Sequence, residues 1–331
     1  MPFLVGMDEA GYGPNLGPLV VAATVWRVGD SRPRDLYDSL GDAITRDAAD
    51  ARATGRLAIA DSKQLYQPQR GLADLERGVL AAVASIGERP RTFDELLAIV
   101  DADRGADRVS RHPRERSAID PISWFAHRDE ALPVAAEATN CDVAANRLRA
   151  AMQSAECRLV CVRTAVVQPQ TFNDLIDAHD GKGAALSETT LGLLSLILSR
   201  LPPEPALVIC DKHGGRNRYG ELLQGRFGDD LVEVRREGRA ASDYRWGPSD
   251  RRIEISFRSG GEAFLPAALA SMAAKYIREL SMRAFNAFWQ AELPSLRPTA
   301  GYPVDARRFR RDIAAAQRRL GISDRVLWRN R

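Results

Sequence analysis

An acidic pair stands at the end of the first apolar run of this sequence. Asp8 and Glu9 follow residues 3–7, an expected strand, and precede a glycine-rich turn. Neighbouring side chains on a strand point to opposite faces, so both carboxylates reach one cation only if the backbone turns there, which Gly11 and Gly13 permit. Carboxylate oxygens favour hard cations such as Mg²⁺ or Mn²⁺. The pair therefore predicts a metal site, and an exposed acidic turn is the alternative.

Two later segments carry groups of the same kind. Asp211 ends the apolar run 206–210 and precedes a glycine turn, a common position for a metal ligand in α/β sheets. A turn or helix N-cap residue is the alternative for this aspartate. Ser271, Lys275 and Glu279 are spaced at i, i+4 and i+8, so a helix places them on one face. A solvent-facing lysine–glutamate pair is the alternative there.

Lysine is rare in this chain, and its positions are informative. Only four of the 47 basic residues are lysines. A lysine kept in an arginine-rich chain indicates a need for a compact ammonium, and four chance survivors are the alternative. The four stand in segments that other features also single out: Lys63, Lys182, Lys212 and Lys275. His213, beside Lys212, is a candidate proton shuttle or a hydrogen-bonded loop residue.

Arginines gather in the segments 104–116, 235–252 and 307–319. If they line a groove for phosphates, the affinity for nucleic acid falls as salt rises. The alternative is that arginine solvates helix and loop faces, which is the preferred interpretation for 307–319.

The glycines after the acidic pair admit a rival interpretation. Gly11, Gly13 and Gly17 follow a strand, as in a dinucleotide-binding loop, but that motif must open a helix. Here Pro14 and Pro18 lead into an apolar, β-branched run instead. No helix N-terminus is expected to hold a pyrophosphate, so this class of site is excluded.

Hydrophobic periodicity predicts an α/β layered domain with a mixed sheet. Residues 3–7 and 19–26 form an expected antiparallel hairpin. Further strands are expected at 159–167, 206–210, 231–236 and 251–258, and helices at 64–86, 131–156, 184–201, 262–290 and 303–320. Residues 91–130 are polar, arginine-rich and interrupted by prolines, which is typical of an insertion or a flexible excursion.

The 331 residues, with a net charge of +3, have the composition of an ordinary globular protein. No stretch approaches the ~18 apolar residues that a membrane-spanning helix needs. The N-terminus lacks the basic and apolar regions of a signal peptide. Four cysteines without a CxxC pair favour a reduced, cytoplasmic protein. We expect no membrane partner and a monomer.

Taken in order along the chain, these motifs resemble those of the type-2 ribonuclease H family, ribonuclease HII and its relatives. The opening strand ends in D-E-A-G-x-G at 8–13, followed by G-P-x-V-x-A-A at 17–23. A D-S-K-x-L motif starts at Asp61, a strand ends at Asp211, and A-S-x-x-A-K-x-x-R-[DE] occupies 270–279. A G-Y pair at 301–302 precedes the last long helix. The resemblance covers most of the chain except about 90–160.

The resemblance implies a ribonuclease H-like fold with a central mixed five-stranded sheet flanked by helices, plus a helical C-terminal part. It implies a catalytic domain over residues 1–260 that carries an insertion at about 90–160. Residues 261–331 are expected to form the helical part that completes the active site and the substrate groove.

The resemblance also implies an activity. The family comprises metal-dependent endonucleases that hydrolyse the RNA strand of RNA–DNA hybrids, or cut at embedded ribonucleotides, and the expected ends are 5′-phosphate and 3′-hydroxyl. The implied partner is nucleic acid and the implied cofactor is Mg²⁺ or Mn²⁺. The implied catalytic, metal-binding carboxylates are Asp8, Glu9, Asp211 and Glu279. The expected substrate-binding residues are Gly11, Tyr12, Gly13, Lys63, Lys182, Lys212, Ser271, Lys275 and Tyr302.

The resemblance also implies a role for several of these residues. Lys63 is expected to contact a phosphate, the backbone of the glycine turn to read the 2′-hydroxyl, and Tyr302 to stack on the neighbouring sugar. Three positions depart from the pattern: Tyr12 replaces an arginine, Lys212 replaces a glycine, and Glu279 in place of aspartate is typical of type-3 enzymes. The departures indicate a divergent member. A non-catalytic nucleic-acid-binding relative and a protein of this fold with unrelated chemistry stay open as alternatives.

Overall fold

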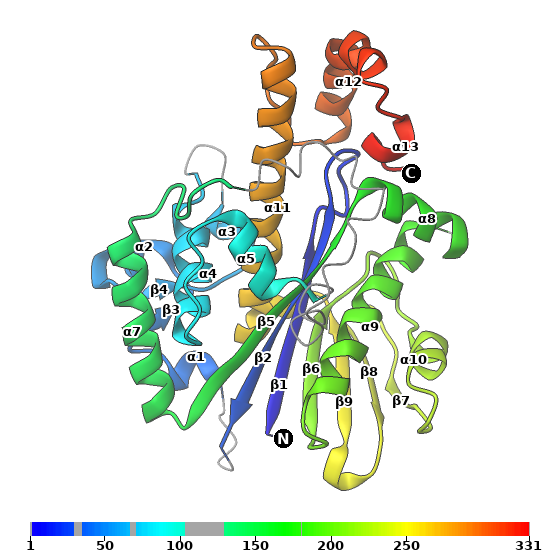
Figure 1. The fold of residues 1–331 in the computed structure, drawn as a ribbon. Helices are drawn as coiled ribbons and strands as arrows, with labels where there is room; N and C mark the ends of the chain where they lie inside the picture. Colours follow the sequence, from blue (N-terminus) through cyan, green and yellow to red (C-terminus); the bar gives the residue numbers. More distant parts are fainter. Residues whose placement is uncertain (1, 30–34, 67–70, 103–128, 180, 331) are drawn as a thin grey trace, which may run out of the picture.

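The computed structural model describes residues 2–29, 35–66, 71–102, 129–179 and 181–330. In this part of the chain, a seven-stranded sheet lies between two layers of helices (Figure 1). Its strands are β1 (Phe3–Ala10), β2 (Leu19–Val28), β5 (Cys157–Val167), β6 (Ala206–Asp211), β7 (Glu233–Arg236), β8 (Ala241–Trp246) and β9 (Ile253–Arg258). A separate parallel pair joins β3 (Ile44–Thr45) and β4 (Leu57–Ala58).

The helices of the described residues vary widely in length. They are α1 (Leu36–Ser39), α2 (Ala48–Thr54), α3 (Ser62–Leu65), α4 (Ala73–Ser85), α5 (Phe93–Val100), α7 (Ala138–Ser154), α8 (Pro169–His179), α9 (Lys182–Arg200), α10 (Gly220–Arg226), α11 (Leu265–Glu292), α12 (Pro303–Arg319) and α13 (Asp324–Leu327). Two 3₁₀ turns occupy Ser249–Arg251 and Gly261–Ala263.

The strand order in the large sheet is β5-β2-β1-β6-β9-β8-β7. β1 pairs antiparallel with β2 and parallel with β6, and β6 pairs parallel with β9. The carboxyl ends of β1, β6 and β9 therefore meet at one edge of the sheet, which is where α/β proteins place their ligands.

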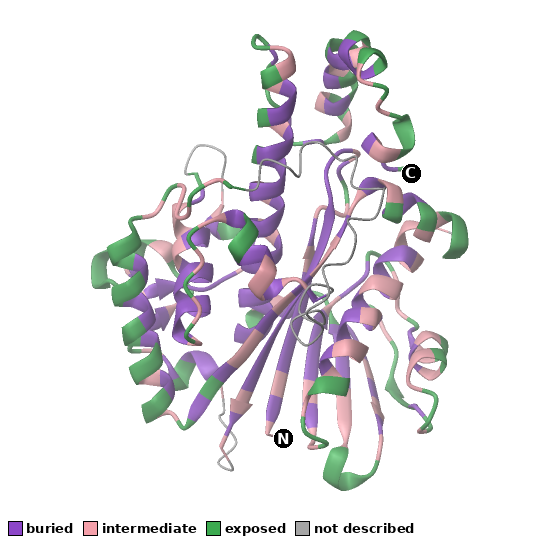
Figure 2. Ribbon diagram, viewed as in Figure 1, coloured by how far each residue is buried: buried purple, intermediate pink, exposed green. Residues whose placement is uncertain are grey.

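Each face of the sheet is covered by its own hydrophobic core. On one face, α4, α7 and α11 pack against side chains such as Val20 and Trp26. On the other, α9 packs against Val5 and Met7. Burial follows this arrangement, because the central strands are buried and the outer faces of the helices are exposed (Figure 2). The alternation along β1 thus assigns successive side chains to opposite cores.

A third hydrophobic cluster joins the C-terminal helices to the β1–β2 connection. Phe285 and Trp289 of α11 pack against Phe309 of α12, with ring centroids 5.5 and 6.2 Å from that ring. Leu16, in the β1–β2 connection, belongs to the same cluster and is fully buried. The β1–β2 connection, which contains the glycine turn, therefore packs against helices α11 and α12.

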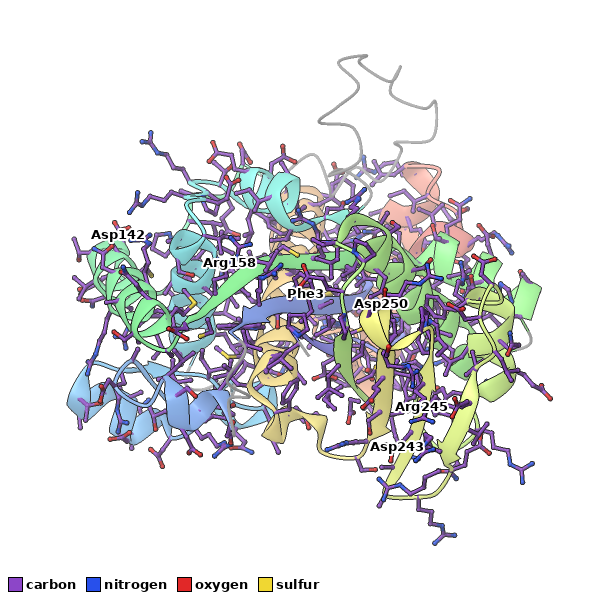
Figure 3. All side chains as sticks on the ribbon, turned by 90° about the horizontal axis from the view of Figure 1, so that it is seen from below. Phe3, Asp142, Arg158, Asp243, Arg245 and Asp250 are labelled. Carbon is purple, nitrogen blue, oxygen red and sulfur yellow. The ribbon has the colours of Figure 1, made fainter. Side chains whose placement is uncertain are left out.

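The expected α/β class and mixed sheet are confirmed, but the number of strands is wrong. The sheet has seven strands rather than five. β8 was not expected, because Asp243 and Arg245 interrupt its apolar residues. Both charges are accommodated by partners, since Asp243 pairs with Arg236 at 2.7 Å and Arg245 with Glu233 at 2.7 Å. Figure 3 shows Phe3 near the middle of the molecule and Asp243 and Arg245, both of β8, toward its periphery.

The expected helices are found with shifted ends, and several short ones were not expected. α1, α2, α5, α8 and α10 are among the latter. The excursion expected at 91–130 falls mostly outside the described residues, at 103–128. Its first part is helix α5, whose buried side chains include Phe93 and Leu96. α5, α7 and the start of β5 belong to the common core, while the insertion at 90–160 and the boundary at 260 stay predictions.

None of the four cysteines forms a disulfide. Within the described residues, no helix combines the length and apolar character that crossing a bilayer requires.

Candidate active site

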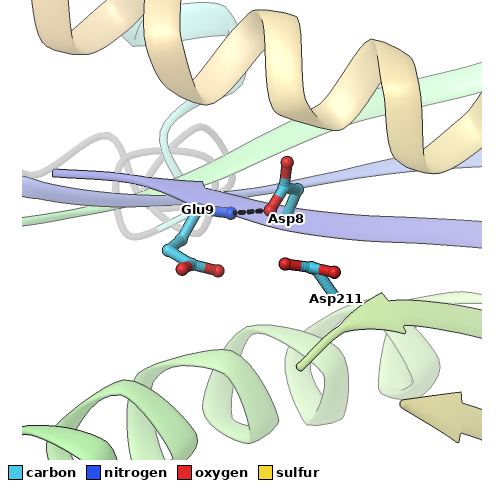
Figure 4. A group of neighbouring side chains, drawn as sticks. All are labelled: Asp8, Glu9 and Asp211. Carbon is cyan, nitrogen blue, oxygen red and sulfur yellow. Dashed lines mark hydrogen bonds between the residues drawn. The ribbon is translucent and has the colours of Figure 1, made fainter. Parts of the chain in front are cut away.

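Three carboxylates meet at the edge of the sheet where β1 and β6 end. Asp8, Glu9 and Asp211 each offer an oxygen, and these oxygens all lie within 4.8 Å of one another. Figure 4 shows the three side chains converging on one space, with α11 on the side of Asp8. The sequence motifs predict this grouping, and the structure brings the three residues together.

The pairing of the strands explains why the three acids meet. β1 and β6 are paired from Phe3↔Ala206 to Met7↔Cys210, so Asp8 and Asp211 stand at the next position of the register. The expected turn of the backbone at Asp8 and Glu9 is wrong, because β1 continues to Ala10 and Glu9 stays opposite Val21. The carboxylates converge instead because pairing with β6 stops and leaves the edge of β1 free.

Burial and mutual repulsion shape the electrostatics of the three acids. The pKa of Asp8 is raised well above its usual value by burial and by the charge of Glu9, and a hydrogen bond with Ser271 opposes this. Burial and the charge of Asp211 raise the pKa of Glu9 to about 7. Burial also raises the pKa of Asp211. Without a cation the cluster therefore retains protons near neutral pH.

A divalent cation fits this donor set. All the ligands are carboxylate oxygens, the type that Mg²⁺ and Mn²⁺ prefer. Opposite ligands of an octahedral Mg²⁺ are about 4.2 Å apart, so small rotations of these side chains suffice for binding. A bound cation also replaces the protons that raised pKa values would otherwise retain.

Glu262 is a fourth acid near this cluster, and the sequence analysis missed it. It lies in the 3₁₀ turn Gly261–Ala263, directly after β9, which is the neighbour of β6. Its charge contributes to the raised pKa values of both Asp8 and Glu9. Burial and the charge of Asp211 raise its own pKa. The available signal was an acid after two glycines at the end of the strand expected at 251–258.

Glu279, the expected fourth ligand, lies elsewhere along α11. It is outside the group of three carboxylates and accepts a hydrogen bond from Tyr66 Oη at 3.1 Å. Lys275 forms an ion pair with it, and the Lys275 ammonium lies 4.4 Å from the centre of the Tyr66 ring. Ser271 lies close enough to Asp8 to lower its pKa, and the eight helical residues from Ser271 to Glu279 span about 12 Å. The role of Glu279 as a ligand stays a prediction.

Lys63 and Ser271 lie beside the acids in different ways. Lys63 is exposed, and although partial burial opposes it, the negative charges of Asp61, Asp8 and neighbouring acids raise its pKa. Its ammonium is therefore available to a phosphate at the edge of the cluster. Ser271 is buried, its Oγ donates to Ser62 Oγ at 3.0 Å, and it lies close enough to Asp8 to lower the pKa of that carboxyl group.

The glycine turn places its residues between the acids and the C-terminal helices. Gly11 has a φ of +91°, and a Cβ there would lie 2.5 Å from Arg278 Nε. Tyr12 lies close enough to Glu9 for that charge, after burial, to raise the tyrosine pKa. A Cβ on Gly13 would meet no atom within 4 Å, so the turn is open at this position. Tyr302 is 52% exposed at the start of α12.

The remaining candidates have structural contacts. Lys212 donates to Asn217 Oδ1 at 2.7 Å and to the carbonyls of Gly238 and Arg216, which uses its three N–H groups. His213 is buried against Ser187, and burial lowers its pKa to about 3. These contacts favour the interpretation of His213 as a hydrogen-bonded loop residue. Lys182 begins α9. The substrate-binding roles of Lys182 and Lys212 stay predictions.

Comparison with known proteins finds similarity only among solved structures. No protein-family model matches the chain, and no curated protein matches it. The ribonuclease H2 of Pyrococcus horikoshii OT3 is 14% identical, with 98% of this chain and 92% of that chain covered and a TM-score of 0.44. The RNase HII of Archaeoglobus fulgidus, solved as a complex with PCNA, is 17% identical, with 99% and 94% covered and a TM-score of 0.42.

A third similar structure is Bst-RNase HIII in complex with Mn²⁺, at 14% identity, 98% and 65% coverage and a TM-score of 0.37. These structures are ribonucleases of the HII and HIII types, the types that the sequence motifs resemble. At such identities and TM-scores, the case for a function has to come from the side chains of the site itself.

Proposed function

We propose that this protein is a metal-dependent endonuclease of the ribonuclease H type. It hydrolyses the RNA strand of RNA–DNA hybrids, or a duplex at an embedded ribonucleotide, and leaves 5′-phosphate and 3′-hydroxyl ends. The observation that carries the proposal is the group of three carboxylates within 4.8 Å at the shared end of β1 and β6. The family motifs around it supply the choice of substrate.

The chain's own residues would hold the reacting groups in place. Asp8, Glu9 and Asp211 would hold one or two divalent ions, with Glu262 as a further carboxylate whose charge acts on Asp8 and Glu9. Bound ions of this kind activate a water for in-line attack on phosphorus and stabilise the departing oxygen. A bond from water oxygen to phosphorus forms, the bond to the 3′-oxygen breaks, and that oxygen takes a proton. Lys63 would contact the phosphate.

Selection of a ribonucleotide would come from the glycine turn. Its open position at Gly13 and the positive φ of Gly11 leave backbone groups free of Cβ atoms. Backbone N–H and C=O groups are suitable partners for a 2′-hydroxyl, which both donates and accepts. Tyr302, half exposed beyond the turn, would pack on the neighbouring sugar.

The test compares three duplexes with Mg²⁺ or Mn²⁺: an RNA–DNA hybrid, DNA with one embedded ribonucleotide, and all-DNA. We expect cleavage of one or both ribonucleotide-containing duplexes and none of the third. Asp211→Asn should lose at least ~100-fold in rate while keeping the fold, because it removes a charged ligand. Binding without cleavage by the unaltered protein, with either metal, would contradict the proposal and favour a non-catalytic nucleic-acid-binding protein.

A pair of matched variants decides which glutamate completes the metal site. Glu262→Gln and Glu279→Gln each remove one negative charge and keep the shape of the side chain. We expect Glu262→Gln to raise the metal concentration needed for half-maximal activity by about tenfold, as loss of a ligand charge does. Glu279→Gln should leave that concentration unchanged. The reverse result would assign the fourth position to Glu279.

A further inference from the structure

A second concave site lies behind the glycine turn, away from the three carboxylates. It is a cavity of about 420 Å³ bounded by the β1–β2 connection, α8, α12 and the segment around α13. These elements come together beside the C-terminus of the chain (Figure 1). The residues that define its chemistry are Arg307, Arg310, Asp324, Arg325, Trp328 and Arg329.

Several buried donors at this cavity have no acceptor. Trp328 Nε1 and the Nε and Nη1 atoms of Arg329 are buried without a hydrogen-bond partner among the described residues. Arg329 is only 3% exposed, and burial together with the charge of Arg278 lowers its pKa to about 9. Tryptophan and arginine side chains donate but do not accept, so only an added acceptor can satisfy them.

The acids nearby leave a surplus of positive charge. The lining includes four arginines but only one carboxylate, Asp324. Asp324 is already engaged by Arg310 at 2.7 Å and by Gln317 at 2.7 Å. Arg325 is paired with Asp174 and Asp177 on α8. Arg307 is exposed and has no ion-pair partner in the described part of the chain.

We propose that this cavity is a phosphate-binding site, separate from the metal site. A phosphate group offers several anionic oxygen acceptors, which match a donor-rich lining, and arginine forks bind it with two parallel hydrogen bonds. The phosphate belongs either to a nucleic-acid backbone or to a small phosphate compound. In the first case the inference rests on the proposed function, since the cavity then extends the substrate path.

Arg329 connects this cavity to the glycine turn. Its Nη2 donates to the carbonyl of Gly11 at 2.5 Å and to the carbonyl of Pro14, and its backbone N–H donates to Asn15 O at 2.9 Å. A phosphate bound in this cavity would therefore lie beside the same arginine that holds the glycine turn.

The first arm of the test measures binding of inorganic phosphate to the full chain in EDTA, by thermal-shift titration. The pocket variant is Arg307→Ala with Arg310→Ala. Its control is Arg311→Ala with Arg318→Ala, which removes two exposed arginines of the same helix outside the cavity. We expect phosphate to bind the unaltered chain and the control, and to bind the pocket variant at least about tenfold more weakly, because charge-assisted hydrogen bonds are lost. No binding to the unaltered chain, or equal binding to both variants, overturns the proposal.

The second arm identifies the source of the phosphate. Binding of an RNA–DNA hybrid is measured without divalent metal over a range of salt concentrations. If the backbone is the ligand, the pocket variant loses about two units of the slope of log Kd against log salt, and the control keeps it. An unchanged slope with lost phosphate binding assigns the site to a small phosphate compound. Because neither arm measures cleavage, both results stay interpretable even if the nuclease assay fails.

Discussion

At the scale of single residues, Asp8 shows how burial sets the requirement for a cation. It is 6% exposed, it lies beside Glu9 and Asp211, and its Oδ1 accepts a hydrogen bond from the backbone N–H of Glu9 at 2.8 Å. Two buried carboxylates at this separation cannot both ionise without a positive partner. Without a cation the site therefore retains protons, and pH sets how many.

The stability of the metal-free protein should fall as pH rises, because Glu9 has a raised pKa of about 7. A raised acid pKa means that the folded state binds the proton more tightly than the unfolded state does. The loss of folding stability caused by ionising Glu9 is therefore absent below about pH 4.5 and complete above about pH 7. Its size is on the order of 3 kcal/mol for Glu9. In EDTA, the melting temperature of Glu9→Gln should exceed that of the unaltered chain more at pH 8 than at pH 5. An equal difference at both pH values would refute this explanation.

The acids differ in how far sequence could predict them. Asp8, Glu9 and Asp211 each end an apolar run, and the ends of neighbouring strands meet, so their grouping was predictable. Glu262 was not, because its approach depends on β9 lying beside β6, which is a long-range property. Glu279 shares a helix face with Ser271, but two helical turns separate them, so the helix pattern alone did not decide whether Glu279 joins the other three acids.

At the scale of elements, the contact between β1 and α11 leaves no room for a side chain. A Cβ on Gly6 would lie 2.0 Å from the backbone N of Ala267 and 2.0 Å from the carbonyl carbon of Pro266. This close approach brings the start of α11 onto the strand that carries Asp8 and places Ser271 one turn further along. Gly6 is thus part of the reason that Ser271 reaches the carboxylate.

Gly6→Ala should therefore cost about 3 kcal/mol in the free energy of unfolding, because the added methyl meets rigid backbone. Gly192→Ala is the matched control, since its Cβ would meet nothing within 4 Å and it lies inside α9. In that control the free energy of unfolding should rise by about 0.5–1 kcal/mol, because alanine has a higher helix propensity than glycine. Urea titration in EDTA measures both, and equal effects of the two changes would exclude the packing explanation.

A buried glutamate joins three elements on the same side of the sheet. Glu76 of α4 accepts from the N–H groups of Val134, Ala135 and Ala136 at 2.6–2.7 Å and from Tyr276 Oη at 2.6 Å. The three backbone N–H groups can only donate, so both carboxylate oxygens of Glu76 act as acceptors there. The segment before α7 is in this way attached to both α4 and α11.

Glu76→Gln should lower the free energy of unfolding by about 3 kcal/mol, because an amide N–H₂ then faces donors in a buried site. Tyr276→Phe removes only one of the four hydrogen bonds and should cost about 1 kcal/mol. Chemical denaturation gives both values. A smaller loss for Glu76→Gln than for Tyr276→Phe would show that the carboxylate is not needed.

At the scale of the whole molecule, α11 unites the expected two parts of the chain. Its buried residues begin at Leu265 and belong to the core that includes β2, α4 and α7. The second half of α11 packs with α12 in the third cluster. The expected domain boundary at residue 260 would therefore separate the sheet from α11, the helix that covers one of its faces.

We expect a chain of residues 1–260 not to fold cooperatively, because removing α11 exposes the core on one face of the sheet. Circular dichroism and thermal unfolding would measure this against the full chain. A single sharp unfolding transition of the shortened chain would instead establish 1–260 as an independent domain.

The class of fold was predictable from hydrophobic periodicity, whereas the number of strands in the sheet was not. The strands of the hairpin and of the buried β6 carry long apolar runs. The edge strand β7 is exposed throughout and its neighbour β8 carries alternating charges, so both have weak hydrophobic patterns, and β8 was not expected. Their charges become understandable only through cross-strand pairs such as Arg236–Asp243.

The arginine-rich segments show the same dependence on tertiary contacts. Segment 104–116 lies outside the described residues. In 235–252, Arg236, Arg245 and Arg251 face acids, and in 307–319, Arg308 forms ion pairs with Asp305 and Asp312. Arginines that are paired within the protein have less to offer a phosphate, so the unpaired ones deserve priority in mutagenesis.

The hydrogen bond from Arg329 to Gly11 spans 318 residues of sequence. At ribosomal rates of about 5–20 residues per second, Arg329 is synthesised roughly 16–64 s after Gly11. The turn beside the acids therefore leaves the ribosome well before one of its supports. A nascent chain carries the carboxylates of β1 for tens of seconds without a finished turn, and the site can be completed only after Arg329 has been synthesised.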